Sequence, residues 1–247
     1  MSTIAVIPAR GGSKGLPKKN IIDLAGQPLI SYTIEAAKNA NLVEQVVVST
    51  DSDEIAKVAL EYGAKVVKRP PNISKDDSPI EDAVRHVVRT LGRNSIDAVV
   101  LLQANVPIRK LGQIDHCLNR LVETGSNSVG TVYEVDQRPE LMKMLQGDHL
   151  IPCSTPNEYR RQDFPPYYLL DGAVLAIRSD TLFDTEGILG AHRFLGDKVS
   201  AVVEEPIFSI ELDDYFDFLV ANAVIAYIRS GKIRFDKLGV SRHEILV

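Results

Sequence analysis

The stretch from Ile7 to Asn20 constrains this chain more than any other part of it. It reads I-P-A-R-G-G-S-K-G-L-P-K-K-N, contains no acid, and directly follows the apolar run from Ile4 to Val6. That run is rich in β-branched residues and too short for a helix, so it predicts a buried strand. The cations of the stretch are Arg10, Lys14, Lys18 and Lys19. Because glycines let backbone N–H groups turn toward a ligand and cations add charge-assisted hydrogen bonds, the pattern favours a phosphate-binding loop over a solvated basic turn.

Two familiar phosphate loops do not fit this stretch. A Walker loop needs a glycine, four further residues and then Gly-Lys-Ser/Thr, but the second glycine would fall on Leu16 or Pro17. A dinucleotide-binding loop opens directly into a helix, which the Pro17-Lys18-Lys19 run prevents here. The stretch is therefore a phosphate loop of another kind.

Composition narrows the classes of function. With 247 residues the chain is long for one domain and short for two, so we expect a single domain over residues 1–247. A net charge of −5 argues against a nucleic-acid or membrane-surface binder, and no stretch is apolar enough to span a bilayer. Cys117 and Cys153 lie far apart without a Cys-x-x-Cys spacing, which favours reduced thiols and a cytoplasmic location.

Strands and helices alternate through the first half of the chain. Hydrophobic periodicity predicts strands at 4–6, 45–49, 64–67, 96–103, 128–132, 174–177 and 199–205. It predicts helices at 28–40, 53–62, from about 79 onward, at 113–123 and at 215–228. This alternation predicts an α/β fold with a mostly parallel sheet and helices on both faces.

The basic stretch resembles the signature of the CMP-acylneuraminate synthetase (acylneuraminate cytidylyltransferase) family, A-R-x-x-S-K-G-x-P-x-K-N, which Ala9 to Asn20 matches. Further matches are V-S-T-D at 48–51, R-P at 69–70 with D-x-S-P at 76–79, and the Gln and Arg of L-Q-A-N-V-P-I-R at 102–109. The resemblance implies a nucleotide-diphospho-sugar transferase fold. It also implies that CTP and an acidic 2-keto-3-deoxy sugar react to give a CMP-sugar and pyrophosphate.

The resemblance assigns roles to individual residues. The expected catalytic residues are Arg10, Lys19 and Asp213. The expected nucleotide-binding residues are Arg10, Gly11, Ser13, Lys14, Asn20, Arg69, Ser78 and Gln103. Arg10, Lys14 and Lys19 would hold the triphosphate and stabilise the leaving pyrophosphate. Arg69 and Ser78 would border the base. We assign no general base.

A pair of acids indicates a metal site. Glu211-Leu212-Asp213 stands where the family has D-I-D, and two acids two apart on a strand share one face. Carboxylates opposite a basic phosphate loop suit a hard divalent cation, so we expect Asp213, with Glu211, to hold Mg²⁺ or Mn²⁺ beside the triphosphate. Asp214 and Asp217 fit instead the acidic first turn of the following helix.

The acceptor side departs from the family. The expected substrate-binding residues are Gln103, Arg161 and Asp171, with Arg161 the candidate for the sugar carboxylate. Leu169 and Asp171 stand where the family has Arg and Asn, which removes a cation and adds an acid near an acidic sugar. One hypothesis is a modified acceptor, such as a deoxy or amino-substituted relative of N-acetylneuraminate. The alternative is drift in a loop that never touches the sugar.

The segment at about 135–170 has weak regularity and many apolar groups. We expect it to be an arm that joins a homodimer, because Leu141, Met144, Leu145, Tyr159 and Phe164 would otherwise be exposed. A mobile lid is the alternative. For the whole chain, two further functions stay open: nucleotidyl transfer to another acceptor (an octulosonate, a phosphonate or a sugar phosphate) or from another NTP, and a non-catalytic nucleotide sensor.

Overall fold

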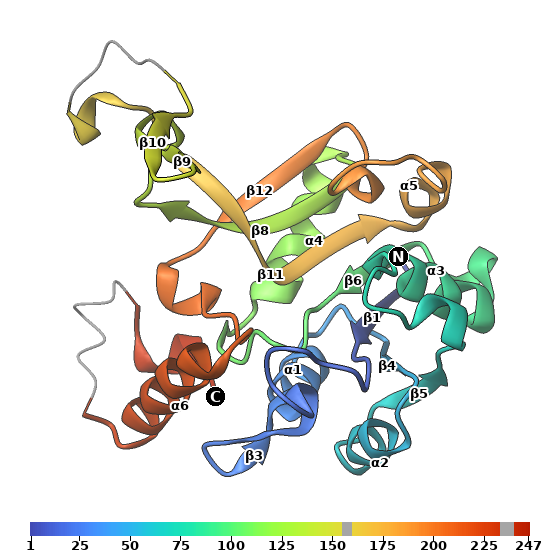
Figure 1. Cartoon of the computed structure of the whole chain (residues 1–247). Helices are drawn as coiled ribbons and strands as arrows, with labels where there is room; N and C mark the ends of the chain where they lie inside the picture. Colours follow the sequence, from blue (N-terminus) through green and yellow to red (C-terminus); the bar gives the residue numbers. More distant parts are fainter. Residues whose placement is uncertain (155–159, 233–239) are drawn as a thin grey trace.

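The computed structural model describes residues 1–154, 160–232 and 240–247, apart from the side chain of Arg161. Within this part of the chain, the central sheet has seven strands in the order β12-β8-β11-β6-β1-β4-β5 (Figure 1). These strands are β1 (Thr3–Pro8), β4 (Gln45–Thr50), β5 (Lys65–Lys68), β6 (Ala98–Leu101), β8 (Ser128–Val135), β11 (Tyr167–Arg178) and β12 (Val199–Val203). Short pairs join β2 (Asp23–Leu24) to β3 (Gln27–Pro28) and β7 (Arg109–Lys110) to β13 (Ile245–Leu246).

The predicted α/β class with a mostly parallel sheet is confirmed. β1 is parallel to β4 and β6, β4 is parallel to β5, and β8 is parallel to β12. Only β11 among the seven described strands runs antiparallel, against both β6 and β8. β11 also starts seven residues before the predicted 174–177 strand, because a register shift between Leu170 and Leu175, with Gly172 at a φ of +65°, breaks its alternation.

Helices cover both faces of the sheet, as expected. They are α1 (Leu29–Lys38), α2 (Asp53–Glu61), α3 (Ile80–Leu91), α4 (Gln113–Thr124), α5 (Ser179–Asp184) and α6 (Tyr215–Arg229). Apolar residues of α1, α2 and α4 pack on one face of the sheet, against alternate strand residues such as Ala5 and Ile7 of β1 and Val46 and Val48 of β4. Residues of α3 and α5 pack on the other face. A buried strand layer between two helical layers explains the near-continuous apolar runs of β1, β4 and β6.

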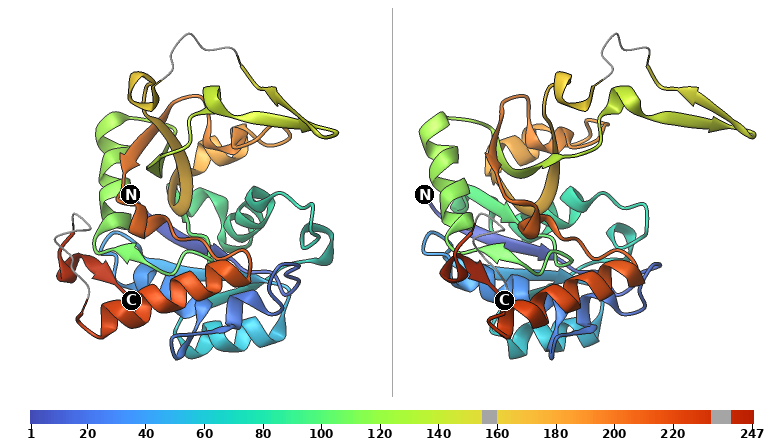
Figure 2. Two further views of the ribbon diagram at one scale, coloured as in Figure 1. Left: turned by 60° about the vertical axis from the view of Figure 1, so that its left-hand side comes forward. Right: turned by 90° about the vertical axis from the view of Figure 1, so that its left-hand side faces the viewer.

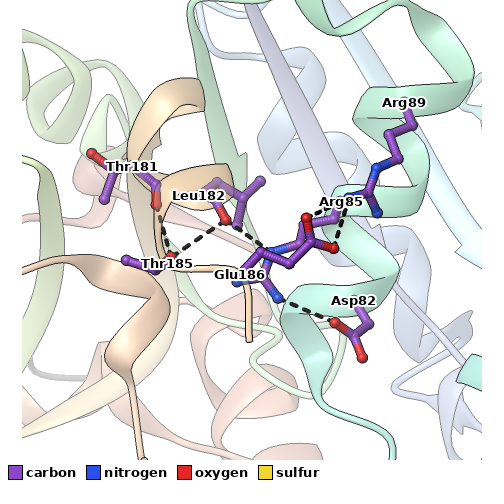
Figure 3. Close-up of polar contacts among 7 residues, drawn as sticks. All are labelled: Asp82, Arg85, Arg89, Thr181, Leu182, Thr185 and Glu186. Carbon is purple, nitrogen blue, oxygen red and sulfur yellow. Dashed lines mark hydrogen bonds and ion pairs between the residues drawn. The ribbon is translucent and has the colours of Figure 1, made fainter. Parts of the chain in front are cut away.

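Side-chain contacts tie α3 to α5 (Figure 3). The buried guanidinium of Arg85 donates to the Leu182 carbonyl at 2.8 Å and to Asp82 at 3.1 Å. One turn further along α3, Arg89 donates to a carboxylate oxygen of Glu186 at 2.6 Å. These contacts fix the position of α3, and with it the loop that leads into its first turn.

A third apolar cluster packs α6 against Leu24, Leu29 and Ile108. Asp214 caps α6 by accepting from the Asp217 amide, and the Asp217 carboxylate accepts from the Asp214 amide in return. Both acids therefore belong to the helix start, as the sequence suggested. The segment just before this cap is held close to the central sheet because the Leu212 amide donates to the Asn105 carbonyl at 2.9 Å.

An antiparallel hairpin of β9 (Lys143–Gln146) and β10 (His149–Pro152) protrudes from the body of the molecule (Figure 2). Leu145 and Leu150 on it are 72% and 71% exposed. Leu141 and Met144 are also exposed, as expected, but Phe164 is only 7% exposed, so that part of the expectation was wrong. Tyr159 lies outside the described residues.

Two further observations concern the cysteines and the helices. Cys117 is buried and Cys153 exposed, and neither forms a disulfide in the described part of the chain. Among the helices of the described residues, none combines the length and the apolar character needed to cross a membrane.

Candidate active site

A cleft of about 410 Å³ lies beyond the carboxyl ends of β1 and β6, the edge at which open α/β sheets bind ligands. Its walls contain most of the expected site residues: Arg10, Ser13, Lys14, Lys19, Asn20, Arg69, Ser78, Gln103 and Asp213. The walls also contain residues to which we assigned no role, namely Pro8, Gly15, Lys75, Asp76, Ile80, Ala104 and Asn105. The fold thus brings the basic loop, the segment before α3, the end of β6 and the segment before α6 to one place.

The loop after β1 is held by two hydrogen bonds, one within the loop and one to the residue that follows β4. The side-chain amide of Asn20 donates to the Arg10 carbonyl at 2.9 Å, which joins the two ends of the loop. The Gly11 amide donates to the Asp51 carboxylate at 2.9 Å, so the acid of the V-S-T-D motif holds this loop. Gly11 does not line the cleft, and contacts of Gly11 and Asn20 with a nucleotide stay predictions.

Each cation of the loop has an acidic partner from a distant part of the chain. The Asp76 carboxylate lies 2.6 Å from both Arg10 and Lys14, and Lys19 donates to Asp213 at 2.9 Å. Lys18 pairs with Glu54, at 2.8 Å, and does not line the cleft. The positive charge of this acid-free stretch is therefore partly neutralised in the folded chain, where its three cleft-lining cations face two carboxylates.

Arg69 lies at the end of β5 with a buried side chain. It donates to the Ser49 carbonyl at 2.6 Å and to the Ser49 hydroxyl at 3.1 Å, and burial lowers its pKa from the usual value. The Ser78 hydroxyl accepts from the Lys75 amide at 3.0 Å, within the loop before α3. Both side chains line the cleft, as their predicted place beside the base requires.

Gln103 is positioned by a buried arginine. Arg109 is fully buried and donates to the carbonyls of Gln103 at 2.8 Å and Ala173 at 3.0 Å, and to the Thr33 hydroxyl at 2.9 Å. Gly172 faces the Gln103 side chain so closely that a Cβ there would lie 2.5 Å from its amide nitrogen. The sequence identified Gln103 but not this support, because the partners come from α1 and β11.

Glu211 and Asp213 do not lie on a strand, so the expectation that they share one strand face was wrong. They belong to an extended segment between a 3-10 helix and α6, and the buried Leu212 between them holds the segment down. Asn105 donates to the same Asp213 oxygen that Lys19 binds, at 3.1 Å. Asn105 had no expected role, because nothing in the sequence brings it near Asp213.

The acid pair fits a hard cation chemically. Burial, then the neighbouring charges of Asp213 and Asp171, raise the pKa of Glu211 to about 7. Because burial and two nearby acids both disfavour the charged carboxylate, a bound cation would stabilise the charged form. No group of three or more His, Cys, Asp or Glu suited to a metal occurs among the described residues. That is compatible with Mg²⁺, which is commonly held by one or two carboxylates together with substrate phosphates.

Asp171 is placed inside the sheet and does not line the cleft. It is 0% exposed, it accepts from the Ala173 amide at 2.9 Å and from the Thr131 hydroxyl, and burial raises its pKa. This burial argues against direct contact with an acceptor and favours the alternative in which the position never touches the sugar. The side chain of Arg161 lies outside the described residues, so its predicted role remains a prediction.

The sheet order, the basic glycine-rich loop and the cleft at the carboxyl ends of the strands define the class as an α/β domain with a ligand site at the sheet edge. The structure is similar to CMP:2-keto-3-deoxy-manno-octonic acid synthetase complexed with CTP, with a TM-score of 0.69 and 18% identity over 92% of this chain and 99% of that one. It is also similar to 4-diphosphocytidyl-2C-methyl-D-erythritol synthase from Anaerococcus prevotii, with a TM-score of 0.66 and 15% identity over 91% and 98% of the two chains. These two likenesses establish the fold.

The chain belongs to the cytidylyltransferase family, whose sequence profile matches residues 4–163. It is 40% identical to a pseudaminic acid cytidylyltransferase of Campylobacter jejuni over 78% of this chain and 85% of that protein. It is 32% identical to an N-acylneuraminate cytidylyltransferase of Streptococcus agalactiae over 89% of this chain and 52% of that protein. The chain thus spans about half the length of that streptococcal relative, and the expected family resemblance is confirmed.

Proposed function

We propose that this chain transfers CMP from CTP to an acidic 2-keto-3-deoxy sugar of the nonulosonate type and releases pyrophosphate. One observation carries the proposal: a single cleft contains three cations of the glycine-rich loop and, facing them, the Asp213 carboxylate. Relatives that act on N-acylneuraminate and pseudaminic acid support the class of acceptor.

In the proposed reaction the anomeric oxygen of the sugar bonds to the α-phosphorus while the bond from that phosphorus to the pyrophosphate oxygen breaks. The hydroxyl proton leaves the anomeric oxygen, and we assign its removal to no side chain. Arg10, Lys14 and Lys19 bind the triphosphate and stabilise the charge on the departing pyrophosphate, helped by Ser13. Because such transfer depends on position and charge, the rigid attachment of this loop through Asn20 and Asp51 serves the chemistry directly.

Asp213 and Glu211 would hold Mg²⁺ or Mn²⁺ in this proposal. The ion would neutralise charge on the phosphate oxygens. Lys19 and Asn105 both bond to one oxygen of Asp213, so they orient that carboxylate toward the loop. Gln103, fixed by Arg109, contacts the nucleotide or the acceptor, and Arg69 and Ser78 border the base.

The proposal is tested by measuring pyrophosphate release with CTP, UTP, ATP and GTP against a panel of acceptors. The panel contains N-acetylneuraminate, its deoxy and amino-substituted relatives, an octulosonate, a phosphonate and a sugar phosphate. We expect release with CTP and one nonulosonate. Pyrophosphate release only with another acceptor or another nucleotide would make the chain a nucleotidyltransferase of different specificity. CTP binding without pyrophosphate release from any combination of nucleotide and acceptor would indicate a nucleotide sensor instead.

We also propose that the chain works as a homodimer joined through the β9–β10 hairpin. The hairpin carries exposed Leu145 and Leu150 on a projection that is detached from the central sheet. An isolated hairpin with so much apolar surface gains stability by packing on a second surface. A lid over the cleft is the competing role for the same segment.

A further inference from the structure

The carboxylate of Asp76 lies between two cations of the phosphate loop. One of its oxygens is 2.6 Å from the Arg10 guanidinium and the other is 2.6 Å from the Lys14 ammonium. The hydrogen bond from Lys14, then the charges of Lys14 and Arg10, hold the pKa of Asp76 below its usual value. A single anion bridging two cations within the cleft is the arrangement that a phosphate group would adopt on the same loop.

The backbone presents Asp76 at the tip of a small turn. The Ser78 amide donates to the Lys75 carbonyl at 3.2 Å, and the Lys75 amide donates to the Ser78 hydroxyl at 3.0 Å. Firm attachments lie on either side of this turn. Arg69 is anchored on Ser49 before it, and α3 is tied to α5 after it (Figure 3). Asp76 itself is 45% exposed, so its carboxylate can leave the two cations without unpacking the core.

We propose that Asp76 is an internal competitor for the pyrophosphate part of the nucleotide site, and that it promotes release of pyrophosphate. The inference rests on the proposed function, in which Arg10 and Lys14 bind the phosphates that leave. A pyrophosphate group that binds these cations displaces Asp76, and the return of Asp76 favours departure of the product. The carboxylate thus weakens binding of substrate and product alike at this subsite, which speeds turnover where release is slow.

The size of the effect follows from the exposure of the pairs. Arg10 and Lys14 are 31% and 82% exposed, so water screens both contacts. Exposed ion pairs each change an equilibrium by a factor of up to about 5, and two pairs together by up to about 30. Removing the charge of Asp76 is therefore expected to tighten pyrophosphate binding by about 2- to 30-fold.

The experiment measures binding of inorganic pyrophosphate and of CMP to wild type, Asp76→Asn and the matched control Asp77→Asn by calorimetry with Mg²⁺ present. Asp77 is the neighbouring exposed acid, and it does not line the cleft. We expect Asp76→Asn alone to bind pyrophosphate more tightly, with CMP affinity unchanged because CMP lacks the leaving phosphates. The gain is expected to shrink in a Lys14→Ala background, which removes one of the two displaced pairs.

Pyrophosphate affinity that is unchanged or weaker in Asp76→Asn would overturn the proposal. So would an equal gain in Asp77→Asn or an equal gain for CMP, since either points to a general change of charge. Because the probe is pyrophosphate, the binding result does not depend on the identity of the acceptor. A wild type that turns over no CTP would reject the proposed function, and the pyrophosphate affinities would still test the role of Asp76. In an active enzyme, Asp76→Asn should lower the KM for CTP and strengthen inhibition by pyrophosphate.

Discussion

Gly15 packs directly against the main chain of Asp213: a Cβ at position 15 would lie 2.2 Å from the Asp213 carbonyl oxygen. The phosphate loop and the proposed metal ligand are therefore in contact through backbone as well as through the Lys19–Asp213 bond. This contact explains why a glycine is needed at position 15, and it links the first and last parts of the chain within one site.

Gly15→Ala is expected to displace the loop or the Asp213 segment, because the added methyl group overlaps rigid backbone. We expect destabilisation of about 1–3 kcal/mol and at least a tenfold loss of kcat/KM. The control is Gly12→Ala, since a Cβ at Gly12 meets nothing within 4 Å. Thermal unfolding and steady-state kinetics of both variants check this, and equal behaviour of the two would contradict it.

Arg10→Ala and Lys19→Ala are each expected to lower turnover by about 10²-fold or more, because each removes a charge-assisted contact to the phosphates. Lys18→Ala is the matched control, as Lys18 pairs with Glu54 outside the cleft. Steady-state kinetics with the true acceptor are the measurement. If both cleft variants kept the wild-type kcat/KM, the proposal that this loop binds the triphosphate would be wrong.

Activity is expected to require Mg²⁺ or Mn²⁺, and Asp213→Asn is expected to abolish most of it without loss of fold. Asp214→Asn is the control. Asp214 is next to Asp213 and caps α6, and Asn caps a helix about as well as Asp, so this variant should keep the helix cap. Turnover is measured with and without chelator, alongside circular dichroism. Full activity in excess chelator would end the metal hypothesis.

Glu204 makes stability depend on pH. Burial raises the pKa of Glu204 to about 7 from its usual value of 4.5, and the charge of Lys110 opposes the shift. Between these two values the folded state binds more protons than the unfolded state, so the free energy of unfolding falls as pH rises from about 4.5 to 7. We expect Glu204→Gln to reduce this fall by about 1–3 kcal/mol. Urea titrations from pH 5 to 8 test this, with the exposed Glu123→Gln as control.

Light scattering at micromolar concentration is expected to give the mass of a dimer. Leu145→Glu should shift the equilibrium toward monomer, because it places a charge on the exposed apolar hairpin. Leu60→Glu is the control, as Leu60 is similarly exposed but lies on α2. A monomer mass for the wild type would leave the hairpin without its proposed partner.

The sequence by itself determined the local features of this protein. The β1 strand, its glycine-rich loop and helices such as α2 and α4 were predictable because periodicity, caps and turn residues lie within a few positions of one another. The α/β class followed from the alternation of those elements. Residues near strand ends, such as Arg69 and Gln103, were placed correctly at the cleft because the carboxyl ends of parallel strands meet at one edge.

Only the tertiary structure decided which groups meet. Lys19 and Asp213 are separated by 194 residues, and nothing local pairs them. The same holds for Asp76 on Arg10 and Lys14, and for the buried environment of Asp171, which looked like an acceptor contact in sequence. The charge of a residue can be read from the sequence. Whether that charge is paired, buried or exposed to water depends on the path of the whole chain, so only the packing decided it.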